Sequence, residues 1–217
     1  MSAEQIIAEP EIPAPGTVAP LLPLALLEAV RAHDRPDELL EDEDLAASLP
    51  RRFGLTGVVA TQIERYQSEL RRGRQVPAED VADLFRLILR RPDAGLILES
   101  AGHLAARRLF ERIPRPAASA LRILPGRATR AAAKRAAQSM LRRIHINGHR
   151  LEVNRDPWTA QLFEPLTMGL DPDGLACNFY AGLIEECFSL YTKERPSVAH
   201  PHCTTHGASY CEWSLTD

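Results

Sequence analysis

The chain has 217 residues, of which 45% are hydrophobic and 25% are charged, and its formal net charge at pH 7 is −3. This balance is typical of a globular domain and excludes disordered, fibrous and coiled-coil proteins. The longest apolar run, Leu21 to Val30, is interrupted by Pro23 and Glu28. It is about half of the roughly 20 residues that cross a bilayer, so we expect no transmembrane segment.

The N-terminal residues predict neither a secretory signal nor a folded element. Met1 to Glu11 contains three acids and no Lys or Arg, so the basic region that opens a signal peptide is missing. We therefore expect a cytoplasmic protein, in which the four cysteines stay reduced. Residues 1–20 contain four prolines and predict a flexible arm.

Residues 21–144 predict a helical region, because apolar residues recur there at helical spacing. Asp93 is a candidate N-cap for one of these helices, and Pro114 ends it. In another, the expected buried stripe holds Val58, Ile63, Tyr66 and Leu70. The expected helices cover residues 24–33, a short segment that ends near Pro50, and residues 57–72, 78–91, 94–113 and 126–144.

Residues 145–217 predict a region of mixed helix and strand. The dipeptide Asn147–Gly148 is a tight-turn signal and predicts a hairpin between residues 145 and 153. The sequence further predicts a strand over residues 162–170, an amphipathic helix over residues 176–191, and two closing strands over residues 197–203 and 209–215. Helices followed by strands indicate an α+β fold in one compact domain, with a helical N-terminal layer on a small C-terminal unit of antiparallel strands.

Charge is distributed unevenly along the chain. Half of its 26 Lys and Arg residues lie between Leu104 and Arg155, a segment that holds only two acids, Glu111 and Glu152. This segment is either an anion-binding surface or a solvated face that complements the acidic residues 34–44. Nucleic acid is not an expected partner, because no aromatic residue lies between Glu111 and Pro157 to stack on bases.

A constellation of cysteine and histidine carries the sharpest chemical signal. Cys177, His200, Cys203 and Cys211 form a C-x22-H-x2-C-x7-C pattern, and its last three members flank a predicted hairpin. Thiolate and imidazole are the ligands that zinc prefers, and four protein ligands make a closed structural site. Such a site would tie the first turn of the helix over residues 176–191 to the two closing strands.

Two alternatives to this ligand set stay open. The cysteines could be small buried residues of a reduced core, as we expect for Cys187, which lies nearly three helical turns beyond Cys177. His202 or His206 could replace His200 as the imidazole ligand. Glu185 and Glu186, side by side on the same predicted helix, indicate a polar face.

His103 is a separate candidate for ligand binding. It lies in the middle of a predicted helix among small residues, where a flat molecule could approach closely. An imidazole there could be an axial ligand to the metal of a tetrapyrrole. The alternative is a partly buried histidine that donates to a backbone carbonyl.

These residues together resemble the 4-vinyl reductase domain family, whose members bind small molecules in bacteriochlorophyll biosynthesis and in sensors of aromatic hydrocarbons. The resemblance is strongest over residues 174–217, in GLACNFYAGLIEECFSLYT and VAHPHCTTHGASYCEWSL. Sensor members carry zinc on Cys, Glu, Cys and Cys at this spacing, and His200 stands at the Glu position here. The resemblance strengthens the expectation of a zinc ion on Cys177, His200, Cys203 and Cys211.

Three upstream segments are similar to the branch of this family that acts in bacteriochlorophyll synthesis. They are FGLTGVVATQIERYQ, LILESAGHLAARRLFERIPRPA and LRILPGRATRAAAKRAAQSMLRRI, and they extend the match over residues 52–217. HINGHRLEV replaces the aromatic, glycine-rich hairpin of that branch. The resemblance implies a helical layer over a small sheet, with an apolar pocket between them.

The resemblance implies a protein that binds a hydrophobic tetrapyrrole intermediate of the divinyl-protochlorophyllide type and assists reduction of its vinyl group. Arg107 or Arg143 could pair with a propionate of that ligand. The chain has no dinucleotide-binding fingerprint, so we expect an accessory carrier rather than a self-sufficient reductase.

Two other functions compete with the carrier. One is a sensing module of the same family, which would respond to an apolar small molecule and act through a partner or a homodimer. The other is the vinyl reductase itself, supplied by a docked electron donor. Enzymes of pigment biosynthesis are the expected protein partners of the carrier.

Overall fold

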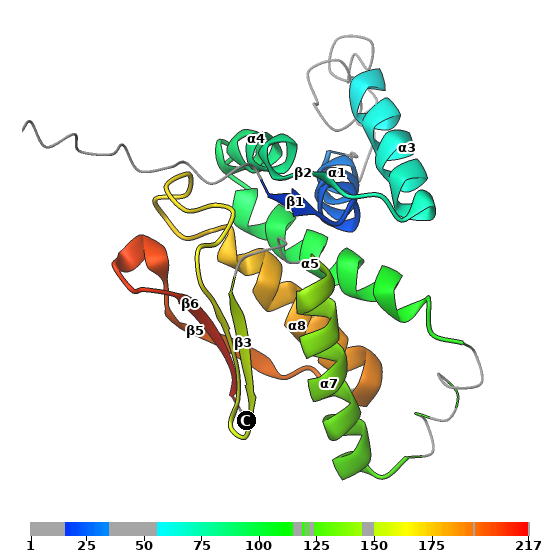
Figure 1. Cartoon of the computed structure of the whole chain (residues 1–217), viewed down its shortest axis with the longest axis vertical. Coiled ribbons are helices and arrows are strands. Elements are labelled where there is room, and N and C mark those ends of the chain that lie inside the picture. Colours follow the sequence, from blue (N-terminus) through cyan, green and yellow to red (C-terminus); the bar gives the residue numbers. More distant parts are fainter. Residues whose placement is uncertain are drawn as a thin grey trace, which may run out of the picture.

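Helices and an antiparallel sheet build the fold, so the expected α+β class is confirmed (Figure 1). The computed structural model describes residues 16–34, 56–114, 119, 121, 124–144, 150–192 and 194–216. The helices are α1 (Leu21–His33), α3 (Gly57–Arg72), α4 (Ala78–Leu89), α5 (Ala94–Phe110), α7 (Gly126–Ile144), α8 (Cys177–Thr192) and the short 3-10 helix η3 (Thr204–His206). The strands are β1 (Thr17–Val18), β2 (Val76–Pro77), β3 (Leu151–Arg155), β4 (Trp158–Leu162), β5 (Ser197–His202) and β6 (Cys211–Thr216).

The elements stack in layers around α8. The sheet packs against α7 and α8, α8 packs against α5, and α5 packs against α1. Helices α3 and α4 and the small β1–β2 ribbon gather around α1, at the end of the molecule away from the sheet (Figure 1). Buried apolar side chains from all of these layers form one continuous core.

The four-stranded sheet has the order β3-β4-β6-β5, and every neighbouring pair is antiparallel. Along β4, Trp158, Ala160 and Leu162 are buried, while the residues between them are half-buried. Ala160 pairs with Trp213 and Leu162 pairs with Cys211, so these buried residues share the face that packs on the helices. This alternation places Cys211 on the inner face of the sheet.

Two helices, α3 and α7, have the bounds that the sequence predicted. The helix α3 begins after Thr56, whose hydroxyl accepts a 3.4 Å hydrogen bond from Val59 N, and it ends at Gly73, which has a φ of 67°. The helix α7 covers residues 126–144, as the periodicity predicted. Asp93 occupies the N-cap position of α5 but does not cap it, because its carboxylate binds Arg91 instead at 2.8 Å.

Three sequence expectations are wrong. The expected strand over residues 162–170 keeps only Leu162, because Pro165 and Gly169, with a φ of 75°, belong to a series of turns. On α3 the buried stripe begins at Val59, and Val58 is 67% exposed. Glu186 is only 7% exposed, so the two neighbouring glutamates of α8 are not a common polar face.

Parts of three other expectations lie outside the described residues. These are residues 1–15 of the expected arm, the short helix near Pro50, and the turn at Asn147–Gly148. Of the last residues of the arm, Thr17 and Val18 pair with Pro77 and Val76 in the β1–β2 ribbon.

Two glycines let α5 and α8 cross in direct backbone contact. A Cβ atom on Gly102 would lie 2.6 Å from Leu183 N and closer still to the carbonyl oxygen of Phe179. A Cβ atom on Gly182 would lie 3.1 Å from the carbonyl carbon of Glu99 and closer still to its oxygen. Only glycine fits at these two positions, so the crossing fixes the register of α5 against α8.

None of the helices in the described part of the chain has the length and apolar character needed to span a bilayer.

Replacement of Gly102 by Ala should destabilise the fold, because its methyl group has to push two backbone segments apart. Overpacking of a core typically costs about 1–3 kcal/mol, and we expect Gly102→Ala at the upper end, since the obstacles are backbone atoms. Urea unfolding measures the change. Gly126→Ala is the matched control, because open space surrounds that helical position, and it should leave the midpoint unchanged or raise it. Equal stability of both variants would contradict the close crossing.

Candidate metal centre

Four ligand atoms converge where α8 meets the sheet. The Sγ atoms of Cys177, Cys203 and Cys211 and a ring nitrogen of His200 all lie within 4.8 Å of one another. The Sγ of Cys177 is 3.7 Å from that of Cys211 and 3.9 Å from that of Cys203, and the Sγ atoms of Cys203 and Cys211 are also 3.9 Å apart. Ligands 2.3 Å from a tetrahedral metal are separated by about 3.8 Å, so the thiols already have the spacing of a tetrahedral metal site.

Each ligand comes from a different element. Cys177 is the first residue of α8, His200 lies in β5, Cys203 precedes η3, and Cys211 opens β6. All three cysteines are less than 10% exposed. Cys187 is buried on α8 away from this group, and its Sγ lies 3.9 Å from the carbonyl oxygen of Ala133. The group could therefore hold a metal ion with the four residues that the sequence pattern selected.

A β-bulge decides which histidine faces the group. Along β5 and β6, Ala199 lies opposite Ser214 and His202 lies opposite Glu212, so β5 contains one extra residue between these pairs. As a result His200 stacks on the buried Trp213, with ring centroids 5.2 Å apart. His202 lies on the outer face, 52% exposed, with its Nδ1 3.7 Å from the Glu212 carboxylate. His206 is also exposed, so neither alternative histidine is placed as a ligand.

The imidazole of His200 has an unused nitrogen. Its Nε2 is buried and has no hydrogen-bond partner within the described ranges. A buried polar atom without a partner costs free energy unless it binds something. A bound metal ion would satisfy it.

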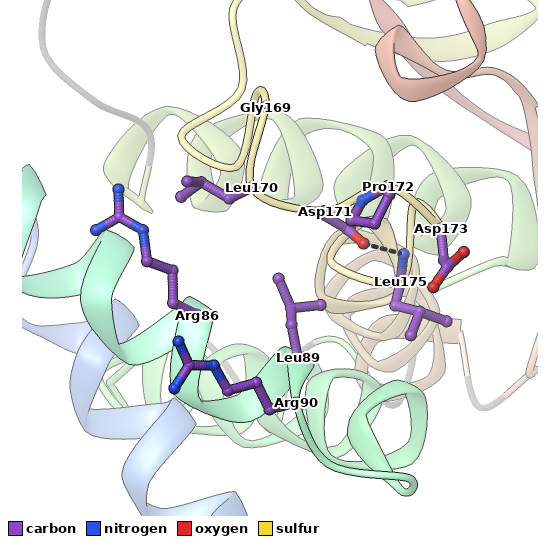
Figure 2. A pocket seen from close by; sticks show the side chains of 9 residues that line it. All are labelled: Arg86, Leu89, Arg90, Gly169, Leu170, Asp171, Pro172, Asp173 and Leu175. Carbon is purple, nitrogen blue, oxygen red and sulfur yellow. Dashed lines mark hydrogen bonds between the residues drawn. The ribbon is translucent and has the colours of Figure 1, made fainter.

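Residues that the sequence analysis missed hold this group in place. Asp171 is only 4% exposed, and its carboxylate accepts hydrogen bonds from Leu175 N at 3.1 Å and Ala176 N at 2.6 Å. It thereby caps the turn of Leu175 and Ala176 that leads into α8 just before Cys177 (Figure 2). Gly174, with a φ of 72°, leaves room for Cys203, whose Sγ would lie 3.3 Å from a Cβ atom there. The Pro-Asp-Gly turn signal at residues 172–174 could have indicated this cap.

The hydrogen bonds within the group favour one thiolate. The Cys177 thiol donates to Cys211, and this hydrogen bond lowers the pKa of Cys211 and raises the pKa of Cys177. Thr204 N lies 3.4 Å from the Sγ of Cys211 and donates to it as well. Burial raises the pKa of Cys187, which has no such donor, to about 12. Cys211 is thus the thiol prepared to lose its proton first, as a metal ligand must.

The three residues expected to contact an organic ligand lie elsewhere. His103 and Arg107 are one turn apart on α5 and face α8, where His103 Nε2 is 3.9 Å from the Glu185 carboxylate. Arg107 donates a 2.7 Å hydrogen bond to the buried Glu186, which raises the pKa of Arg107. Arg143 is exposed near the end of α7. None of the three lines either of the two clefts described next.

The smaller cleft lies between α4 and the loop that leads to α8. It has a volume of about 380 Å³. Figure 2 shows Arg86 and Arg90 on the α4 side and Asp171 and Asp173 in the loop opposite. None of the four candidate ligands lines this cleft, although its loop side leads directly to Cys177.

The larger cleft, of about 560 Å³, lies at the other end of α8, between α7 and the end of the sheet where β4 begins and β6 finishes. Trp158, Phe188 and Leu215 give it apolar walls, and the two aromatic rings meet edge to face with centroids 5.7 Å apart. The basic side chains of Arg127, Arg130, Lys134 and Arg195 also line it. Part of the basic segment therefore faces a cleft.

Loss of the Asp171 carboxylate should destabilise α8. Replacement of a capping residue typically costs about 0.5–2 kcal/mol, and we expect Asp171→Ala to cost about 2 kcal/mol because two buried N–H groups lose their acceptor. Thermal or urea unfolding of the metal-free protein measures the change. Asp173→Ala, in the same loop but exposed, is the control and should be within about 0.5 kcal/mol of wild type. If both variants had the same stability, the cap would not contribute.

Comparison of the chain with models of protein families, with curated proteins and with solved structures finds no match in any of the three.

Proposed function

We propose that this chain is a small-molecule-binding protein of the 4-vinyl reductase type, with its C-terminal unit clamped by a structural zinc ion. The observation that carries the proposal is the convergence of Cys177, His200, Cys203 and Cys211 within 4.8 Å. Three thiolates and one imidazole are a common structural zinc set, and they leave no position open for catalysis.

The donor set favours zinc over harder ions. Thiolates bind Zn²⁺ far better than Mg²⁺ or Ca²⁺, and the spacing of the sulfur atoms suits tetrahedral coordination. The buried Nε2 of His200 gains a partner when the ion binds. Bound there, zinc would cross-link α8 to β5 and β6 and so add stability to this end of the core.

For the organic ligand we propose a hydrophobic tetrapyrrole intermediate of the divinyl-protochlorophyllide type, held in the larger cleft. Trp158 and Phe188, which are 3% and 4% exposed, form an apolar floor for this cleft. Arg127 and Lys134 line the cleft and offer positive charge to a carboxylate of the ligand, although Lys134 Nζ also donates a 2.8 Å hydrogen bond to the carbonyl oxygen of Arg155. Arg107 does not line this cleft, and its guanidinium already binds Glu186.

The chain would act as a carrier or accessory protein in bacteriochlorophyll biosynthesis rather than as a reductase. Hydride or electron transfer needs a carrier such as nicotinamide or flavin, and a closed zinc site supplies none. The carrier would present the vinyl group to a separate reductase. A sensing module would use the same cleft and zinc site, but its output would be a change in a partner protein.

The zinc proposal predicts about one zinc ion per chain in protein purified without chelators. Cys203→Ser should reduce the zinc content, measured by elemental analysis, below about 0.2 per chain and lower the thermal stability. Cys187→Ala removes a buried thiol that lies outside the site and should retain the zinc. The apparent affinity for zinc should rise with pH, because the Cys177 thiol, whose pKa is raised, has to lose its proton when it binds the ion. A zinc-free wild type, with Cys203→Ser equally stable, would refute the proposal.

The ligand proposal predicts that protochlorophyllide shifts its Soret band and co-elutes with the protein at micromolar concentration. The double variant Arg127→Glu and Lys134→Glu should weaken binding at least about tenfold, because charged hydrogen bonds to the carboxylate are lost. Arg143→Glu is the matched control on the same helix and should bind as wild type. An unchanged spectrum without co-elution would reject the carrier.

An activity assay separates the carrier from the enzyme. Vinyl reduction measured with NADPH should require an added reductase, and the carrier should accelerate it. Reduction by the purified chain with NADPH and no other protein would instead identify the chain as the reductase.

A further inference from the structure

A second group of metal-ligand side chains lies at the crossing of α5 and α8. One ligand atom from each of Glu99, His103 and Glu185 lies within 4.8 Å of the other two. We propose that these three residues form a binding site for a divalent first-row transition metal ion, separate from the cysteine-containing group. The proposal does not depend on the proposed function of the chain.

The close helix crossing brings these three side chains together. Glu99 and His103 are four residues apart on α5, so they lie on the same face of that helix. The backbone of Gly182 lies against the backbone of Glu99, which places Glu185, one turn further along α8, beside His103. The distance from His103 Nε2 to the Glu185 carboxylate is 3.9 Å, which is too long for a hydrogen bond and leaves room for an ion between them.

The composition of the group selects the kind of ion. One imidazole and two carboxylates suit Mn²⁺, Fe²⁺ or Zn²⁺, since imidazole binds transition metals and carboxylate also accepts harder ions. Two carboxylates neutralise the ion's two charges. Three protein ligands leave coordination positions open to water or to an anionic group of a further ligand.

The surroundings keep these ligands available. The side chains of His103 and Glu185 are 28% and 31% exposed, so an ion can reach them from solvent. The nearest arginine on the same face, Arg107, binds Glu186 at 2.7 Å rather than Glu185. The two neighbouring glutamates of α8 thus have separate roles: the buried Glu186 binds the exposed Arg107, and Glu185 completes the candidate site.

Manganese titration tests the proposal in the full chain with zinc already bound, because thiolate sites discriminate against Mn²⁺. The electron paramagnetic resonance signal of free Mn²⁺ should fall by one ion per chain. Glu99→Gln, His103→Ala and Glu185→Gln should each weaken this binding at least about tenfold. Glu111→Gln, an exposed acid at the end of the same helix, should bind Mn²⁺ as wild type. Zinc content and far-UV circular dichroism check that the variants are folded.

Two results would overturn the proposal. The first is a wild-type protein that leaves the free Mn²⁺ signal unchanged at millimolar manganese. The second is Mn²⁺ binding that the three variants do not weaken, which would place the ion elsewhere, for example on the acidic residues 37–44. Neither result would alter zinc content or pigment binding, so the outcome is distinguishable from a failure of the proposed function.

Discussion

The backbone contact between α5 and α8 is the constraint on which the rest of the structure depends. Gly102 and Gly182 have no side chain to hold the helices apart, so α8 can lie only in one register against α5. In that register Cys177, the first residue of α8, meets the sheet, and Phe188, near the other end of α8, lines the larger cleft. The same contact makes α8 a central element, with α5 on one side and the sheet on the other.

Ion pairs connect the basic segment to acids from other parts of the chain. Arg107 binds Glu186, Arg108 binds Glu28, and Arg130 binds Glu194 at 2.9 Å. These pairs connect α5 to α8, α5 to α1, and α7 to the segment after α8. The described part of the basic segment therefore forms ion pairs with acids outside residues 34–44 and also lines a cleft, and its role as an anion-binding surface stays a prediction.

Features set by residues close together in the sequence could be predicted, whereas side-chain partners that come from distant parts of the chain could not. The bounds of α3 and α7 follow from caps and periodicity, and the ligand set follows from the chemistry of sulfur and imidazole spaced around a hairpin. The partner of His103 comes from α8, more than eighty positions along the chain, and no local pattern reveals it. The burial of Glu186 has the same cause, since its arginine partner lies on another helix. For residues 162–170 the local pattern itself was misleading. Their apolar composition indicated a strand, but Pro165 and Gly169 lie in a series of turns.

The bulge in β5 has a consequence for the two histidines of this strand. Side chains before and after the extra residue exchange faces, so the usual rule that alternate residues point the same way is broken between Ala199 and His202. Under strict alternation His200 and His202 would lie on the same face of the sheet. Because of the bulge, one imidazole lies inside against Trp213 and the other lies outside beside Glu212, so a single extra residue separates a candidate ligand from a surface side chain.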